Sequence, residues 1–277
     1  MSSLRAFAGS RRALAVACGH SDGTIEIIKP GTPDSIRLHG TGFDDGWRRL
    51  DISADAEMVA LAHYYGGVEL WSINRRCRVM SAKGLGGAQA IEFIGDTSDM
   101  LVESERKGTV RLSAEGAELK CIPGFRFGAI SRDGELCFGR GRQSLSLIEL
   151  RGHQVVAEWD AKSFGIITAC FAGRSVVVAE ALGWLRLLHR DGTERVVDHG
   201  GERWAVIHSL SPVAATRAVV GWGLLPGDSI GPAAELFRID LNSGDVETLL
   251  RREPQFACAI GDGSQWMFAD GERVVVA

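Results

Sequence analysis

The residues that could carry acid–base or metal chemistry are dispersed along this chain of 277 residues. Its seven His are scattered, and no Cys or His group has the spacing of a zinc site. Acid–base catalysis needs titratable groups that converge in space, and the best supply is Asp51, Glu92 and His208. Oxygen ligands for a hard cation are sparse, and no Gly-rich phosphate loop follows a strand and opens a helix. We therefore predict no cofactor and no metal site, and we keep catalysis as an alternative.

Composition limits the class of protein. The hydrophobic content of 45% and charged content of 24% are typical of soluble globular domains. The net charge of −4 gives no electrostatic support to nucleic-acid binding, and no apolar run approaches the roughly 18–20 residues that span a bilayer. Residues Ser10 to Cys18 are similar to an export signal, but their apolar core is too short. The six Cys form no C-x-x-C pair and sit mostly in apolar stretches, which predicts buried free thiols and a reducing compartment. The lack of recognisable targeting signals predicts a cytoplasmic location.

One phrase recurs along the chain: an apolar strand, a small turn and a second, alternating strand. The seven copies cover residues 14–28, 58–71, 100–114, 135–150, 175–190, 217–241 and 265–277. Their turn residues are Gly23, Gly67, Gly108, Gln143, Gly183, Ala233 and Gly271. These markers recur on average every 41 residues or so, within the range of a four-stranded propeller blade.

Each copy carries further strand-like segments. An alternating segment precedes the phrase, as in Arg48 to Ser53, and a short one follows it, as in Cys77 to Ser81. Period-2 alternation rich in Val, Ile and Leu is the pattern of half-buried antiparallel strands. Helical periodicity is nearly absent. The sequence therefore predicts an all-β protein.

This pattern resembles the WD-repeat family of β-propellers over essentially the entire chain. The best copy, Ile52 to Ile73, is similar to the family's run of S-x-D, an apolar strand, a Gly turn and a strand ending in Trp. Trp71 occupies the Trp position, but Ser72 replaces the usual Asp, and most copies lack the usual Gly-His.

The resemblance implies one domain over residues 1–277, a seven-bladed β-propeller of four-stranded antiparallel blades, with six or eight blades as alternatives. The last copy stops after its third strand. Either the last blade has three strands, or Met1 to Ala8 pair with it. A further alternative is that the chain is one piece of a longer or oligomeric assembly.

In propellers that resemble this chain, ligands bind on the face where the first strand of each blade begins. Alignment of the copies at that point gives a rim rich in Trp, Phe and Arg, residue types that are enriched in binding hot spots. The predicted partner-binding residues are Trp47, Arg48, Gln89, Phe125, Arg126, Phe164, Arg203, Trp204 and Phe256. Trp222 is added because Gly221 to Pro232 is expected to be the longest irregular loop. The rim would hold a peptide or an acidic loop of a partner; alternatively, its rings fill the channel or pack between blades.

We therefore predict a non-catalytic protein-interaction scaffold, with no nucleic-acid or membrane partner. The alternatives are a propeller enzyme of hydrolase or lyase type with its site in the channel, and a subunit of a larger complex. Replacing both Trp47 and Trp204 by Ala is expected to abolish partner binding while leaving the thermal midpoint nearly unchanged.

Overall fold

The alternating segments form strands throughout the part of the chain that the structure, a computed structural model, describes. That part comprises residues 4–32, 34–39, 47–63, 67–141, 143–161, 165–198, 203–213, 218–225, 234–251, 256–260, 265–270 and 273–276. Within it, the one helix is the single-turn 3-10 helix η1 (Ala181–Gly183). No helix in these ranges is long and apolar enough to cross a bilayer.

Consecutive strands pair antiparallel in chain order. The first strands are β1 (Leu4–Gly9), β5 (Trp47–Ile52), β9 (Ala88–Phe93), β13 (Arg126–Ile130), β17 (Ile166–Ala172), β21 (Val206–Val213) and β25 (Phe256–Ile260). The second strands are β2 (Val16–His20), β6 (Met58–His63), β10 (Met100–Ser104), β14 (Leu136–Arg140), β18 (Ser175–Glu180), β22 (Ala218–Leu224) and β26 (Gln265–Asp270). The third strands are β3 (Thr24–Ile28), β7 (Gly67–Ser72), β11 (Gly108–Leu112), β15 (Ser144–Glu149), β19 (Leu185–Leu188), β23 (Ala234–Asp240) and β27 (Arg273–Val276). The fourth strands are β4 (Ile36–His39), β8 (Cys77–Ala82), β12 (Glu118–Ile122), β16 (Val155–Asp160), β20 (Glu194–Asp198) and β24 (Val246–Arg251).

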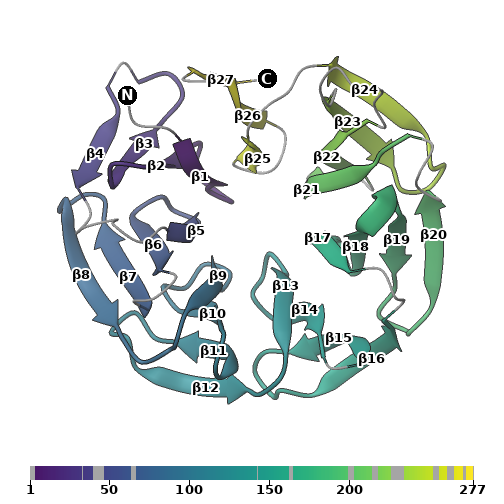
Figure 1. Ribbon diagram of the computed structural model, residues 1–277, viewed down its shortest axis with the longest axis horizontal. Helices are drawn as coiled ribbons and strands as arrows, with labels where there is room; N and C mark the ends of the chain where they lie inside the picture. Colours follow the sequence, from purple (N-terminus) through teal and green to yellow (C-terminus); the bar gives the residue numbers. More distant parts are fainter. Residues whose placement is uncertain are drawn as a thin grey trace.

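These sheets stand around a central channel as the blades of a β-propeller (Figure 1). Six blades have four strands, and the last described sheet, β25 to β27, has three and contacts both β1 and β21 through β25. The prediction of seven four-stranded blades is therefore wrong in its count, and six such blades, the alternative, are present. Because β1 pairs with β2, the start of the chain belongs to the first blade and does not extend the last sheet. We number the four-stranded blades 1 to 6.

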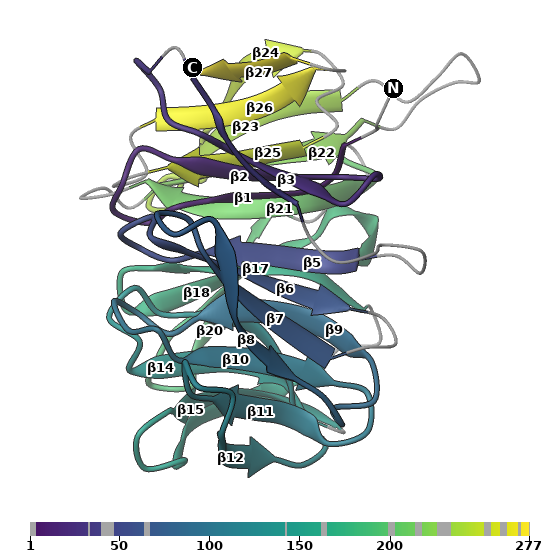
Figure 2. The same cartoon turned by 90° about the vertical axis from the view of Figure 1, so that its left-hand side faces the viewer.

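First strands lie nearest the channel and fourth strands on the circumference (Figure 1). Seen from the side, the blades form a disc with two faces (Figure 2). We call the face where first strands begin the front face, and the opposite one the rear face. The front face points toward the viewer in Figure 1 and to the right in Figure 2.

Burial of apolar side chains between neighbouring blades holds the disc together, because a single twisted sheet cannot cover both of its own faces. One core joins Ile27 of blade 1 to Leu61 and Trp71 of blade 2, and another joins Phe138 of blade 4 to Val178 of blade 5. The hydroxyl of Ser10, after β1, donates to the carbonyl of Ala54 at 2.7 Å and so ties the rear turns of blades 1 and 2 together.

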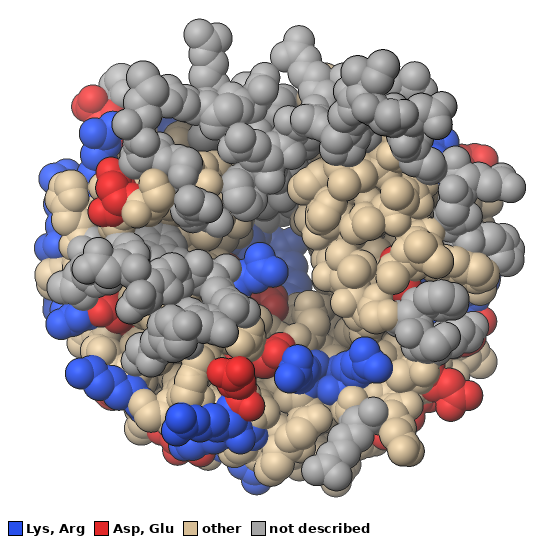
Figure 3. All heavy atoms as spheres, in the orientation of Figure 1, with Lys and Arg blue, Asp and Glu red and all other residues tan. Residues whose placement is uncertain are grey.

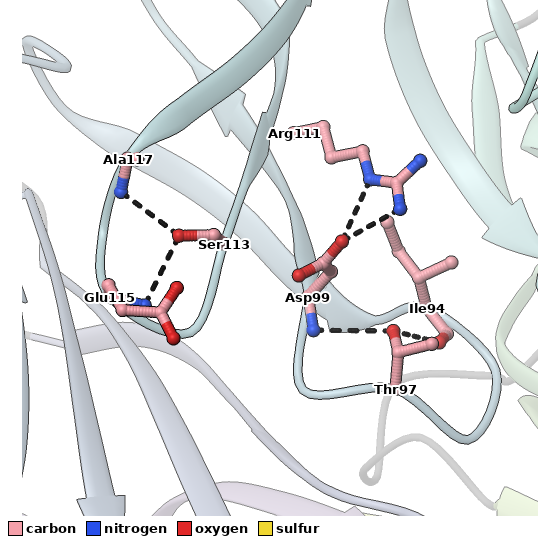
Figure 4. Close-up of polar contacts among 7 residues, drawn as sticks. All are labelled: Ile94, Thr97, Asp99, Arg111, Ser113, Glu115 and Ala117. Atoms are coloured by element: carbon pink, nitrogen blue, oxygen red, sulfur yellow. Dashed lines mark hydrogen bonds and ion pairs between the residues drawn. The ribbon is translucent and has the colours of Figure 1, made fainter.

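Hydroxyl and carboxylate side chains close the rear turns, where they satisfy backbone N–H groups. In blade 3, the N–H of Asp99 donates to Thr97 Oγ1 and the N–H of Ala117 donates to Ser113 Oγ (Figure 4). Arg111 then donates to the Asp99 carboxylate at 2.7 Å, which joins the second and third strands.

The cysteines only partly follow the prediction of buried free thiols. Cys18, Cys137 and Cys170 are free and buried, and burial raises the pKa of Cys18 and Cys170 to about 12. Cys77 is free but exposed, because it begins an outer strand. The side chain of Cys258 lies outside the described part.

Candidate functional site

The first strands of the six four-stranded blades carry the same irregularity near their front ends. In all six four-stranded blades, one extra residue of the first strand has no partner on the second strand, which makes a β-bulge. The extra residues are Arg5, Arg48, Gln89, Gly128, Ile167 and His208. Gly128, Ile167 and His208 are exposed and Gln89 is half-buried, while the side chains of Arg5 and Arg48 lie outside the described part. Because bulges redirect side chains next to binding sites, this ring is the candidate site.

Arginines border one side of the channel opening. Arg126 is 70% exposed and lies 3.7 Å from Glu103 of blade 3, and Arg49 of blade 2 acts electrostatically on the same carboxylate. Burial raises the pKa of Glu103, against the opposing effect of these two arginines. Arg140 is exposed and directly opposite Arg126 in the β13–β14 register. We call Arg49, Arg126 and Arg140 the basic arc, and Figure 3 shows basic side chains gathered along this part of the opening.

The other side of the opening, over blades 5 and 6, is largely uncharged in the described surface (Figure 3). Ile167 is 44% exposed and Leu182, in η1, is 55% exposed. His208 stacks on Trp222 with ring centroids 4.4 Å apart. Since η1 and β17 both contact β21, these four residues lie on adjoining elements. We call Ile167, Leu182, His208 and Trp222 the apolar arc.

Leu182 has an unusual backbone. Its φ of +66° lies in the left-handed region, which is costly for a bulky side chain. The next residue, Gly183, has φ +76°, and a Cβ there would come within 2.2 Å of the Trp204 carbonyl oxygen. The two residues therefore form a tight turn that holds the Leu182 side chain out toward solvent.

Burial against its neighbours lowers the pKa of the His208 imidazole below the ordinary 6.5, which favours its neutral form. Ile167, Leu182 and Trp222 carry no ionisable group, in contrast to the arginines of the basic arc.

Two predicted rim residues lie in the core instead. Trp204 is 0% exposed, and its Nε1 donates to Glu235 Oε1 at 2.7 Å. Phe125 is 4% exposed, and its ring covers Gly139. These two rings are therefore not offered to a partner, in agreement with the alternative that some rings pack within the blades.

Arg203 and Trp222 are partly exposed, but their surroundings differ from those predicted for a rim. Arg203 donates to Glu235 at 2.9 Å and lies 5.2 Å from the Trp204 ring, so it belongs to the same buried network. Trp222 is in strand β22, so the expectation of an irregular loop from residue 221 is wrong for residues 221–224. The rest of that stretch from 226 onward lies outside the described residues.

Gln89 and Arg126 do lie at the opening as predicted. Phe164, and the side chains of Trp47, Arg48 and Phe256, fall outside the described part. The sequence pattern did not single out Arg49, Arg140, Ile167 and Leu182, because they occupy ordinary strand and turn positions.

The structure does not bring the three acid–base candidates together. Asp51 and Glu92 lie near the rear ends of β5 and β9, whereas His208 is at the front of β21. Burial raises the pKa of Asp51 to about 6, although nearby Arg11 and a 2.8 Å bond from the Phe93 N–H oppose this. Among the residues described, no three His, Cys, Asp or Glu side chains could together hold a metal ion.

The arrangement of blades defines the class of protein by its fold: a β-propeller. No protein-family model matches the chain, and no curated protein matches its sequence. Among solved structures, a chain in one titled "Crystal Structure of Mitotic Checkpoint Complex" is similar, with a TM-score of 0.77 and 11% identity. The match covers 96% of this chain and 83% of that one. At this identity the likeness shows the fold alone, which many unrelated functions share.

Proposed function

We propose that this protein is a non-catalytic interaction scaffold that binds a protein partner at the front of its channel. The observation that carries the proposal is the ring of bulges, which presents exposed residues from blades 4, 5 and 6 around one opening. The sheets behind the ring are rigid and tightly packed, so the exposed residues are held in place before a partner arrives. Preorganisation of this kind lowers the entropic cost of binding.

The membership of the similar propeller in a multi-protein complex supports a protein as the partner. The free thiols, including exposed Cys77, support a reducing, cytoplasmic location for the interaction.

Site-specific photo-crosslinking tests the proposal. A photoreactive phenylalanine analogue is placed at Gln89 or Ile167, at the opening, and separately at Val155, an exposed residue on the circumference. Cells that naturally make the protein are irradiated, and the covalent adducts are identified by mass spectrometry. We expect one protein to crosslink from both front positions and not from Val155. A partner that crosslinks from Val155, with no adduct at the front, would show that the interaction surface lies elsewhere.

A further inference from the structure

We propose that the partner segment is acidic and carries one large apolar side chain, so that it bridges the basic and apolar arcs. This inference rests on the proposed function and specifies the chemistry of the partner.

Among the described residues, the three arginines of the basic arc are accompanied by one carboxylate that an arginine of the arc contacts, Glu103. Arg49 and Arg126 share Glu103, and Arg140 faces Arg126 across the β13–β14 register. Like charges directly opposite each other on paired strands are destabilising, and a bound carboxylate would relieve that repulsion. The whole chain, in contrast, has a net charge of −4. The guanidinium fork matches a carboxylate with two parallel hydrogen bonds.

The apolar arc supplies the second contact. Exposed Leu182 sits in a strained left-handed conformation, and strain of this kind clusters at functional sites. Exposed Ile167 lies in the same blade, and η1 contacts the strand that carries His208. A partner's apolar side chain placed here would cover both aliphatic groups.

The basic and the largely uncharged sides face each other across the front opening (Figure 3), and in the proposal one extended segment spans both. A polyanion without apolar side chains would use the basic arc alone. Acidic peptide is favoured over nucleic acid because bases stack on aromatic rings and guanidinium planes, whereas Ile167 and Leu182 offer aliphatic groups that suit an aliphatic side chain.

Fluorescence anisotropy with the full chain tests this chemistry. The probe is a labelled peptide in which a central leucine is flanked by aspartates and glutamates. We expect saturable binding that weakens as salt is raised, since exposed ion pairs are screened. The Arg126→Glu, Arg140→Glu double variant should bind at least about tenfold more weakly. Leu182→Gly should also bind more weakly while its melting temperature stays equal or rises, because glycine accepts a positive φ.

Matched controls separate the arcs from general surface effects. Arg75→Gln removes an exposed arginine from a rear turn, and Val155→Ser removes an exposed aliphatic group from the circumference. Both should bind the probe like the unmodified protein. On the unmodified protein, a probe with serine in place of leucine should bind more weakly than the leucine probe. On Leu182→Gly, the two probes should bind equally.

Three results would overturn the inference. The first is that a lysine-containing probe binds as tightly as the acidic probe, and the second is that neither the double arginine variant nor Leu182→Gly changes binding of the acidic probe. The third is that a single-stranded oligonucleotide binds more tightly than the acidic probe, with an affinity that Leu182→Gly leaves unchanged. If the front positions crosslink a partner but the acidic probe does not bind, the proposed scaffold function is kept and only the proposed partner chemistry is refuted. If the crosslinks lie elsewhere, both proposals are refuted.

Discussion

The indole Nε1 of Trp204 donates a hydrogen bond of 2.7 Å to the buried carboxylate of Glu235, across blade 6. The same carboxylate accepts from Arg203 at 2.9 Å and from the Thr248 hydroxyl at 3.0 Å. The Trp204 ring also packs on Phe237, with centroids 4.2 Å apart. This network joins the segment before β21 to the third and fourth strands of the blade, so Trp204 stabilises the fold.

Substitution of Trp204 should therefore lower stability, contrary to the expectation from sequence. Trp204→Phe keeps most of the ring but leaves Glu235 without its indole donor, at a cost of about 1–3 kcal/mol. Trp204→Ala also opens a cavity and should cost about 3–5 kcal/mol. Urea denaturation measures both. An unfolding free energy unchanged in Trp204→Ala would contradict the buried placement.

Periodicity could not reveal where the rings before each first strand point. Trp204 and Phe125 both stand just before alternating strands, as rim residues would. Their burial depends on missing Cβ atoms in neighbouring strands, at Gly223 for Trp204 and Gly139 for Phe125. A glycine inside a strand marks such a close approach, and this was the available sequence signal.

A buried ion pair in blade 5 gives a second prediction. Arg186 and Glu180 are almost fully buried and 2.7 Å apart, and Arg186 also pairs with Glu194. Arg186→Met leaves the Glu180 charge buried without its partner and should cost about 3–5 kcal/mol. Adding Glu180→Leu should restore much of the loss, because the stranded charge is gone. A double-mutant cycle by chemical denaturation measures this; strictly additive losses would refute the coupling.

The raised pKa of Asp51 predicts that stability depends on pH. Its pKa is about 6 in the folded protein and 3.8 for the free side chain, so the folded state holds this proton to higher pH. The unfolding free energy should therefore fall as pH rises from about 4 to 6, by up to about 3 kcal/mol.

Asp51→Asn keeps an oxygen that can accept the Phe93 N–H and removes the charge. Relative to the unmodified protein, the variant should gain stability between pH 4 and 6 and keep that gain at pH 8. The difference between the two proteins isolates Asp51 from other titrating groups. A variant that is less stable at pH 8 would show that Arg11 outweighs the effect of burial.

The stack between His208 and Trp222 gives a fourth prediction. Because burial lowers the pKa of His208, its ring protons should titrate below the ordinary 6.5 in an NMR pH series. Trp222→Ala exposes the imidazole and should move the pKa upward toward that value. Identical titration in both proteins would mean that Trp222 does not bury the ring.

Strand positions followed closely from the sequence, because period-2 alternation and glycine turns are local signals. Two marker glycines, Gly67 and Gly108, begin third strands with positive φ; at Gly67, a Cβ would come within 2.0 Å of the Ala82 carbonyl oxygen. The bulges were not foreseen, since an extra residue such as Ile167 changes the pairing without changing composition. The two arcs could not be predicted from the sequence either, because Arg126 and Leu182 come to lie on the same face only through the arrangement of blades.

Hydrogen–deuterium exchange with the crosslinking partner tests the central claim most directly. The purified protein is compared alone and with that partner bound. We predict slower exchange at the front ends of β13 and β17 and across η1, with the outer strands β12 and β16 unchanged. Protection confined to rear turns or to the circumference would contradict a binding site at the front of the channel.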